Sequence, residues 1–522
     1  MSGEKENVEI DAAMASQDQK TKSDVLGADA EKQSLSDVGV DEALKIVGSG
    51  AGVELDAAAN RRLLRKIDFH LLPILSLLYG LQFLDKTTIS YASVMGIVKD
   101  THLHGTQYNW LGSVFYLGYL FAEYPANLAL QRFPISKFLS SQIILWGAAL
   151  MLHAACSNFA GLATVRILLG VLESSVSPGF ALIVSQWWRK EEQGFRTGIW
   201  FCWNGMGSIF GAVVSYAIAT SIKSHHYTVL KGWQLMFLMT GGLTVICGII
   251  FFFTIPDSPA NAWFLTKEEK VAAVERIRSN NQGVGNKVFK KHQMIEALKD
   301  PAAWMIFVYS FTTSIPNGAT TTFKNVILQG FGLSPELSLL YGAPSGAVQL
   351  VGTLVICWLA DRLKQRLYMS MVALVCPVIG FALLATLPKK NLNGQLASFY
   401  ITSISAAAFT LVLSMISSNI AGQTKKVTVA TMMFIAYCIG NLIGPQIIHL
   451  KDGPRYLNAK IIICVLYGFC AFVLLALRFV WVWRNARKER AIAELGDAYV
   501  HIPNQEFMDL TDQENKEFRY VL

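Results

Sequence analysis

Arg166-Ile-Leu-Leu-Gly-Val-Leu-Glu-Ser-Ser-Val-Ser-Pro-Gly179 places two opposite charges inside an apolar run that extends from about residue 159 to residue 188. Arg166 and Glu173 are seven residues apart, or about two helical turns, so both project from one face, roughly 10 Å apart along the axis. A charge at the centre of a membrane helix costs about 2.5–3.5 kcal/mol on insertion scales. We therefore expect this pair to be used or neutralised, and the rest of the chain to shield it.

The composition of the chain is that of a membrane protein. Of its 522 residues, 52% are hydrophobic and only 16% are charged, which is too apolar for a water-soluble protein of this size. The net charge of +8 comes from basic residues between apolar runs, so membrane topology explains it better than nucleic-acid binding does. The eight cysteines lie in or beside apolar runs, in a spacing that suits neither a disulfide framework nor a zinc site.

Twelve apolar runs are each about 20 residues or longer, which is enough to span a bilayer. They lie at about 69–90, 109–131, 136–156, 159–187, 195–220, 232–255, 301–323, 336–360, 367–387, 396–418, 426–449 and 457–482. The sequence thus predicts an all-α membrane protein with twelve transmembrane helices in two six-helix halves, 61–255 and 301–483.

Three polar segments complete the expected organisation: a disordered N-terminal tail (1–60), a central loop (256–300) and a C-terminal tail (484–522). A basic cluster precedes the first run, and basic residues flank every second turn after it. The positive-inside rule therefore places all three segments in the cytosol. Two such halves suit alternating access to a site at mid-membrane. In the central loop, Thr266-Lys-Glu-Glu269 predicts a capping box that opens an amphipathic helix, with Val271, Val274 and Ile277 on its docking face.

The first apolar run carries Asp85 and Lys86, which as helical neighbours point about 100° apart. Either Lys86 attracts an anion while Asp85 takes up a proton, or the pair lies near the outer surface and is solvated. Arg166 and Glu173 also allow two interpretations: a static ion pair inside the bundle, or a substrate-binding Arg with a proton-accepting Glu. Desolvation and a nearby cation act in opposite directions on such a carboxyl group, so water access can switch its protonation.

Two amides and one charged motif are further candidate site residues. Asn204 and Asn441 lie in Gly-containing apolar runs, where each either binds substrate or bonds a neighbouring helix. The motif Trp358-Leu-Ala-Asp-Arg-Leu-Lys-Gln-Arg366 joins the eighth and ninth runs. Its Asp361, Arg362 and Arg366 can lock a neighbouring helix end in one access state and release it in the other.

These residues resemble the major facilitator superfamily. The stretch 357–366 is similar to its inter-helix signature, and Leu84-Asp-Lys, Arg166-x6-Glu173 and Pro256-Asp-Ser-Pro259 are similar to its anion:cation symporter family. The fungal allantoate permease branch of that family also shows Asn419-Ile-Ala-Gly-Gln-Thr-Lys-Lys, Gly440-Asn-Leu-Ile-Gly-Pro-Gln and a tail like Asn515-Lys-Glu-Phe-Arg-Tyr520. The resemblance covers about residues 60–520 and implies the major facilitator fold.

The resemblance also implies proton-coupled uptake of a small organic anion. By correspondence with bacterial sugar-acid relatives, Asp85 and Glu173 carry protons, Lys86 and Arg166 attract the anion, and Asn204 and Asn441 orient it. Position 86 carries Lys where those relatives have Arg, so the planar fork of a guanidinium is absent there. Substrates of the fungal branch include allantoate, ureidosuccinate, nicotinate, pantothenate, thiamine, cysteine and sulfonates, and no motif here chooses among them.

We accordingly predict a multi-pass plasma-membrane symporter, monomeric, without cofactor, metal or nucleic-acid partner. Its partners would be protons, a small organic anion and the lipid bilayer. A nutrient sensor that keeps the fold and signals through its tails is the alternative. No metal-ligand cluster, nucleotide loop or nucleophile–base constellation favours an enzyme, and two half-bundles with buried charges suit occlusion better than a continuous pore.

Overall fold

The structure is a computed structural model that describes residues 56–225, 230–278, 290–388, 390–449, 452–453, 455–495 and 510–522. Helices joined by turns make up these residues, and no strand occurs among them. The all-α class is therefore confirmed. Most of the predicted disordered tail, residues 1–55, lies outside the described residues, and the first described helix begins at Ala57.

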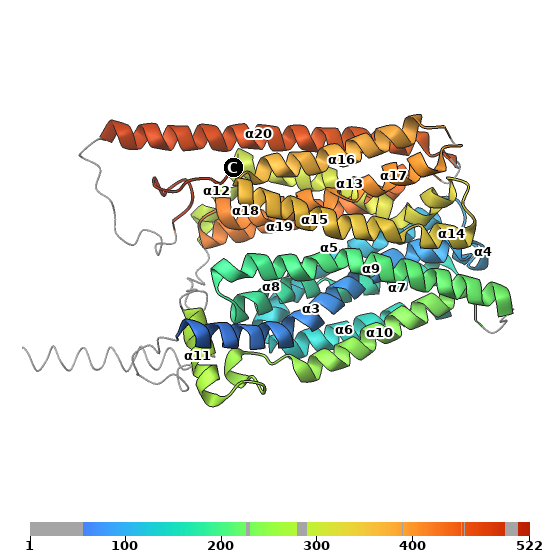
Figure 1. Ribbon diagram of the computed structural model, residues 1–522, viewed down its shortest axis with the longest axis horizontal. Helices are drawn as coiled ribbons and strands as arrows, with labels where there is room; N and C mark the ends of the chain where they lie inside the picture. Colours follow the sequence, from blue (N-terminus) through green and yellow to red (C-terminus); the bar gives the residue numbers. More distant parts are fainter. Residues whose placement is uncertain are drawn as a thin grey trace, which may run out of the picture.

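The described helices form two halves that follow one another along the chain and lie side by side (Figure 1). The first half contains α3 (Ala57–Val94), α5 (Gln107–Arg132), α6 (Ile135–Leu152), α7 (Phe159–Glu173) with α8 (Val176–Trp187), α9 (Lys190–His225) and α10 (Gly232–Thr254). The second contains α13 (Pro301–Gln329), α14 (Pro335–Leu340) with α15 (Ala343–Leu363), α16 (Arg366–Thr386), α17 (Leu392–Thr402) with α18 (Ser405–Asn419), α19 (Gln423–Ile443) and α20 (Leu457–Leu495).

Ten helical segments among the described residues are long and apolar enough to cross a membrane. The other two crossings, α5 and α13, have 26 and 29 residues, which also suffices in length. Neither is among the ten apolar segments, and both pack against the opposite half. The chain is thus a multi-pass membrane protein, and the helices of its described residues account for the twelve crossings that the apolar runs predict.

The fourth crossing is broken immediately after Glu173, where the sequence predicts one continuous run. α7 ends at Glu173, Ser174 and Ser175 form a turn, and α8 begins at Val176. Pro178 contributes to this break, because it has no N–H to offer the carbonyl group of Ser174, four residues earlier. Glu173 therefore lies at a helix end, where its orientation does not follow from helical periodicity.

The two halves lie side by side, and the bundle has two distinct ends (Figure 1). We call the end that carries the start of α3, α11 (Lys267–Arg278), α12 (Lys291–Lys299) and residues 510–522 the tail end. The other end, with α4 (Ile97–Asp100) and α14, is the far end. The main helix pairs that join the halves are α3 with α13, α5 with α19, and α9 with α15, and α9 also contacts α14.

The halves touch most closely through two glycines. A Cβ atom on Gly205 of α9 would lie 2.6 Å from the carbonyl oxygen of Gly346 on α15, and one on Gly346 would lie 2.5 Å from that of Gly205. Neither contact leaves room for a side chain, so the two helix backbones meet directly, as small residues allow in membrane proteins. This contact fixes the distance between α9 and α15.

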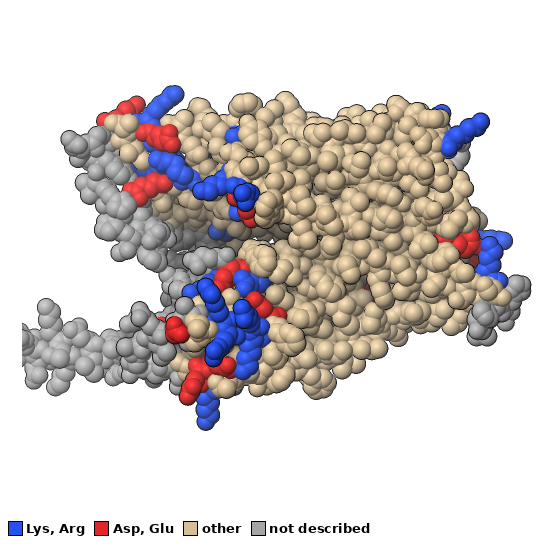
Figure 2. Space-filling model, viewed as in Figure 1, with Lys and Arg blue, Asp and Glu red and all other residues tan. Residues whose placement is uncertain are grey.

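Hydrogen bonds that join described residues of the two halves cluster toward the far end. Tyr108 donates to the carbonyl of Thr322 at 2.8 Å, and Asn109 donates to the carbonyls of Pro445 and Ile448 at 2.7 and 2.6 Å. At the tail end, Figure 2 shows the surface hollowed between the halves, with charged side chains on both sides of the hollow. The structure is therefore closed at the far end and open at the tail end.

The loop helix α11 forms the expected capping box but docks through a different face. Thr266 N donates to Glu269 Oε2 at 2.9 Å, and Glu269 N donates to Thr266 Oγ1 at 3.2 Å. The predicted docking residues Val271 and Val274 are only half-buried, and the side chain of Ile277 lies outside the described residues. Ala272, Ala273 and Arg276 are buried instead, and Arg276 pairs with Glu192 at the start of α9. The predicted docking face was therefore wrong, because this ion pair and the two alanines hold a different face of the helix against the bundle.

Residues 510–522, which we call the C-terminal segment, pack on the tail end of the second half. Asp512 is fully buried, with Oδ1 2.7 Å from the ammonium of Lys425, and it accepts a 2.6 Å hydrogen bond from Tyr520 Oη. Lys425 also lies 3.2 Å from Asp300, which pairs with Arg484 at 2.5 Å. Burial raises the pKa of Asp300, but Arg484 and Lys425 outweigh it and hold the pKa below its ordinary value.

Candidate functional site

The ion pair at the centre of the first half joins two helices. Lys86 Nζ of α3 lies 2.8 Å from Glu173 Oε1 of α7, and the two side chains are 17% and 0% exposed. The lysine also lies 5.9 Å from the ring centroids of both Phe115 and Tyr119 on α5. Glu173 is thus neutralised by Lys86, and not by Arg166, whose pairing with Glu173 was one of the two interpretations of the sequence.

Arg166 is buried without a carboxylate partner among the described residues. It is 2% exposed, and its Nε and Nη2 atoms have no hydrogen-bond partner in the described part of the chain. The static Arg166–Glu173 ion pair, one of the two interpretations of the sequence, does not form in this structure. Unpaired donors on a buried cation are costly, so this guanidinium is available to an anionic ligand.

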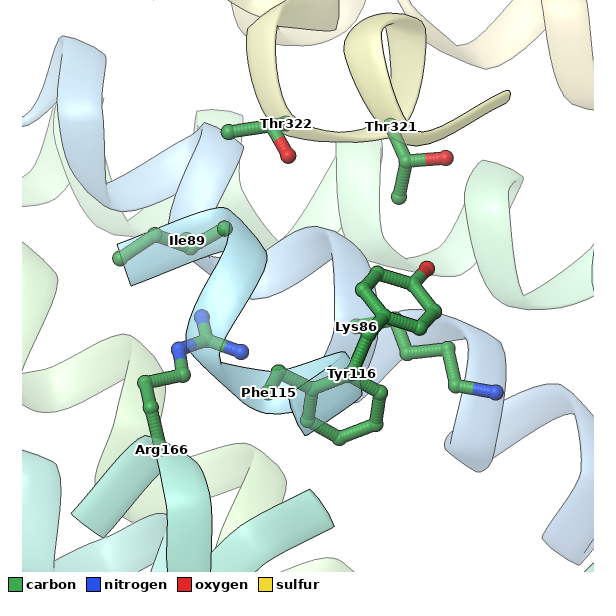
Figure 3. Close-up of a pocket in the computed structure, with 8 residues that line it drawn as sticks. Lys86, Ile89, Phe115, Tyr116, Arg166, Thr321 and Thr322 are labelled. Atoms are coloured by element: carbon green, nitrogen blue, oxygen red, sulfur yellow. The ribbon is translucent and has the colours of Figure 1, made fainter. Parts of the chain in front are cut away.

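A small pocket between the halves connects these cations. It is lined by Lys86, Ile89, Gly112, Phe115, Tyr116, Arg166, Thr321 and Thr322. In Figure 3, Thr321 and Thr322 approach from α13 and Arg166 approaches from the opposite side, while the amino group of Lys86 points away from Arg166. The first half therefore supplies both charges of the lining, and the second half supplies two hydroxyl groups.

Asp85 faces away from this pocket, into the first half. Its Oδ2 accepts a hydrogen bond from Thr244 Oγ1 of α10 at 3.1 Å, and it is fully buried. Its Oδ1 has no partner within the described residues. Asp85 and Lys86 thus diverge, as adjacent helical residues must, and the solvated surface pair considered as the alternative does not occur. Whether Asp85 takes up protons stays a prediction.

Asn204 lies on the interior side of α9. Gly205 contacts α15 and Gly207 contacts α3, whereas Met206 is 40% exposed on the outer side. At 100° per residue, Asn204 falls between the sides facing α3 and α15, opposite Met206. The amide is half-buried and makes no hydrogen bond to another described residue. It is free to bind a ligand, although it does not line the small pocket.

Asn441 is engaged in helix packing in this conformation. Its Nδ2 donates to the carbonyl of Tyr437 at 2.8 Å, and its Oδ1 accepts from Asn317 Nδ2 at 2.9 Å. The side chain is fully buried against Gly318 of α13. Of the two interpretations of Asn441, this structure shows the bond to a neighbouring helix, and substrate contact stays a prediction.

The Asp361–Arg366 motif forms its bonds within the second half. Arg366 Nη2 lies 3.2 Å from Asp361 Oδ1, and Arg366 Nη1 donates to Ser418 Oγ at the end of α18 at 3.0 Å. The backbone N–H of Arg366 donates to the carbonyl of Leu522 in the C-terminal segment at 2.8 Å. Arg362 lies over the ring of Trp358, 5.5 Å from its centroid. The motif thus holds a helix end, and its release in another access state stays a prediction.

Several residues near the pocket were not predicted from the sequence as site residues. Tyr116 and Tyr437 meet edge to face across the halves, 6.0 Å between ring centroids. A tyrosine in an apolar helix gives no pattern that separates a cavity wall from ordinary packing. His153, fully buried and stacked on Phe237 at 4.7 Å, was likewise not considered. Among the described residues, no group of His, Cys, Asp and Glu could hold a metal ion.

Known proteins match this chain along most of its length. Residues 75–445 match the Major Facilitator Superfamily. An uncharacterized transporter of Schizosaccharomyces pombe is 39% identical, covering 95% of this chain and 96% of that protein. The allantoate permease of Saccharomyces cerevisiae is 40% identical, and the match covers 92% of this chain and 90% of that protein. A solved structure of a bacterial homologue of the human lysosomal transporter Spinster, inward-facing and occupied, matches with a TM-score of 0.60 at 16% identity. The match covers 79% of this chain and 97% of that chain, and it shows a shared fold alone.

Proposed function

Because the chain belongs to the Major Facilitator Superfamily, whose matched relatives are transporters and not enzymes, we propose that it imports a small organic anion together with protons by alternating access. Allantoate is the first substrate to test, since the allantoate permease of Saccharomyces cerevisiae is 40% identical over 92% of this chain. A carboxylate with hydrogen-bonding groups fits a pocket with two cations and two hydroxyls.

The unpaired guanidinium of Arg166 carries this proposal. It is buried, it lines the pocket between the halves, and two of its nitrogens have no partner among the described residues. An anion that bound there would replace the missing partner with charge-assisted hydrogen bonds. Lys86 is held by Glu173 in this conformation, so Arg166 is the stronger attractor for the anion.

Proton coupling is proposed to run through Glu173. When this carboxyl group takes up a proton, its ion pair with Lys86 weakens and the ammonium becomes available to the anion. Proton and anion would then bind together and leave together. Asp85, buried beside Thr244 and apart from the pocket, would be a second proton acceptor within the first half.

The orientation follows from the charge pattern of the sequence. The basic residues around the tail end place that end in the cytosol under the positive-inside rule, so this conformation would be inward-open. The proposed location is the plasma membrane, where the far end would face the medium. The second half's Asp361–Arg366 pair would then lie on the cytosolic side.

The proposal is tested with purified protein in liposomes under an imposed pH gradient. Wild type should concentrate radiolabelled allantoate, while Glu173→Gln should lose pH-driven accumulation and keep exchange, because glutamine cannot bind the coupled proton. Glu268→Gln, an exposed carboxylate on α11, is the control and should behave as wild type. Full pH-driven accumulation by Glu173→Gln would refute the proton assignment. Growth of a null strain on nitrogen, sulfur and vitamin sources would identify another substrate.

A further inference from the structure

A third cation lies inside the membrane region, on the second half. Lys324 is on α13, and its ammonium donates to Ser208 Oγ of α9 at 2.6 Å, across the two halves. No carboxylate among the described residues pairs with it. An ammonium inside a membrane protein is costly without a carboxylate partner, and one neutral hydroxyl does not offset that cost.

Lys324 follows the pocket threonines on α13, about one helical turn after Thr321. Thr321 and Thr322, which line the pocket, precede it on α13, and α13 runs from the tail end to the far end. On α9, Ser208 lies one turn beyond Asn204 on the same side of the helix. The backbone of Lys324 therefore lies nearer the far end than the two threonines of the pocket.

The groups around Lys324 are uncharged, and their hydrogen bonds join the halves. Asn325 N donates to Ser90 Oγ at 3.1 Å, and Tyr91 Oη donates to the carbonyl of Ser208 at 3.2 Å. Together with Lys324 and Ser208, we call these residues the outer polar layer. Since the other members are uncharged, the layer carries a net positive charge, which favours an anion once the halves separate at the far end.

We propose that Lys324 is a second anion-binding position, which receives a small carboxylate entering from the far end before it reaches Arg166. In the closed conformation Ser208 takes the place of the carboxylate. When the far end opens, α13 moves away from α9 and the ammonium of Lys324 is released to the incoming anion. This inference rests on the proposed anion transport and adds the residue that would capture the substrate.

A competing explanation is that Lys324 and Ser208 form only a latch between the halves. The two explanations predict different behaviour for the two partners. If the bond is only a latch, Lys324→Gln and Ser208→Ala both break it and should change allantoate uptake alike. If Lys324 captures the anion, Lys324→Gln should raise the KM at least tenfold, Lys324→Arg should largely restore it, and Ser208→Ala should leave it equal or lower.

A second measurement does not depend on the substrate. A cysteine introduced by Thr321→Cys is modified from the far side with an anionic and a cationic methanethiosulfonate, and the rate of the parent protein is subtracted. Lys324→Gln should lower the anionic-to-cationic rate ratio severalfold. Lys99→Gln, which removes an exposed lysine of α4 at the same end, is the matched control and should not change the ratio.

The outcomes separate this inference from the proposed function. An unchanged rate ratio in Lys324→Gln, or equal changes of KM in Lys324→Gln and Ser208→Ala, would overturn the role of Lys324 even if wild type accumulates allantoate. If wild type does not accumulate allantoate, the assigned transport fails, whereas a rate ratio that depends on Lys324 would still support an anion position there.

Discussion

Replacing Arg166 or Lys86 by methionine should change the stability of the unliganded protein in opposite directions. Both are cations of the first half near one pocket, but only Lys86 has a carboxylate partner, Glu173. Arg166→Met removes a buried charge with no such partner among the described residues and keeps much of the side-chain volume. Since a charge at mid-membrane costs on the order of 3 kcal/mol, we expect this variant to be up to about 3 kcal/mol more stable.

Lys86→Met leaves Glu173 fully buried without its cation. At 2.8 Å and an effective dielectric of about 20, the lost Coulomb attraction is about 6 kcal/mol, and desolvation of the pair offsets part of it. The carboxyl group of Glu173 can avoid the remaining cost of a buried, unpaired charge by taking up a proton. For an ordinary glutamate of pKa about 4.3, that costs about 4 kcal/mol at pH 7.5 and about 1.6 kcal/mol at pH 5.5. The loss should therefore be about 3–4 kcal/mol at pH 7.5 and should shrink as the pH falls.

The assay is reversible unfolding in mixed micelles with increasing SDS, followed by the fluorescence of the 12 tryptophans. It is run at pH 7.5 and pH 5.5 for wild type, both single variants and Lys86→Met/Glu173→Gln. The double variant should recover most of the loss, because it removes the carboxylate that Lys86→Met leaves unpaired at position 173. Destabilisation by Arg166→Met, or a loss in Lys86→Met that does not depend on pH, would refute the assignment of partners.

Two further predictions concern the tail end and the interface between the halves. Asp300→Asn should loosen the C-terminal segment, because it leaves Arg484 without its carboxylate and weakens the bond that Asp300 accepts from Gln513. The cost should be about 3–5 kcal/mol, seen as faster limited proteolysis. Because the pKa of Asp300 lies below its ordinary value, wild-type docking should persist above about pH 4 and be lost as the pH falls through that lower pKa. Gly205→Ala should force α9 away from Gly346 and reduce closure of the far end, measured by cysteine cross-linking. Gly198→Ala on the same helix, where a Cβ meets nothing within 4 Å, should be neutral or slightly stabilising, and equal effects of the two substitutions would contradict the packing argument.

The sequence was sufficient for the architecture because apolar length and basic flanks act on each crossing separately. The capping box of Thr266 and Glu269 was also confirmed, because it depends only on residues that are close in the sequence. The partner of Glu173 could not be predicted in this way, because a break at Ser174 and Ser175 ends α7 and the carboxylate pairs with Lys86 of another helix. The docking face of α11 failed for a similar reason, since the ion pair with Glu192 depends on tertiary placement.

The positions of the charges bear on how the proposed cycle works. Lys86, Arg166 and Glu173 all belong to the first half, so a rocking motion of the two halves leaves the distances among them nearly unchanged. Their protonation would then respond to water reaching the pocket, not to separation of the ion pair. Anion contacts are different, because the hydroxyls of Thr321 and Thr322 and the ammonium of Lys324 come from the second half and move relative to Arg166. An anion held from both sides would draw the halves together around it, and the proton on Glu173 would be enclosed by the same closure.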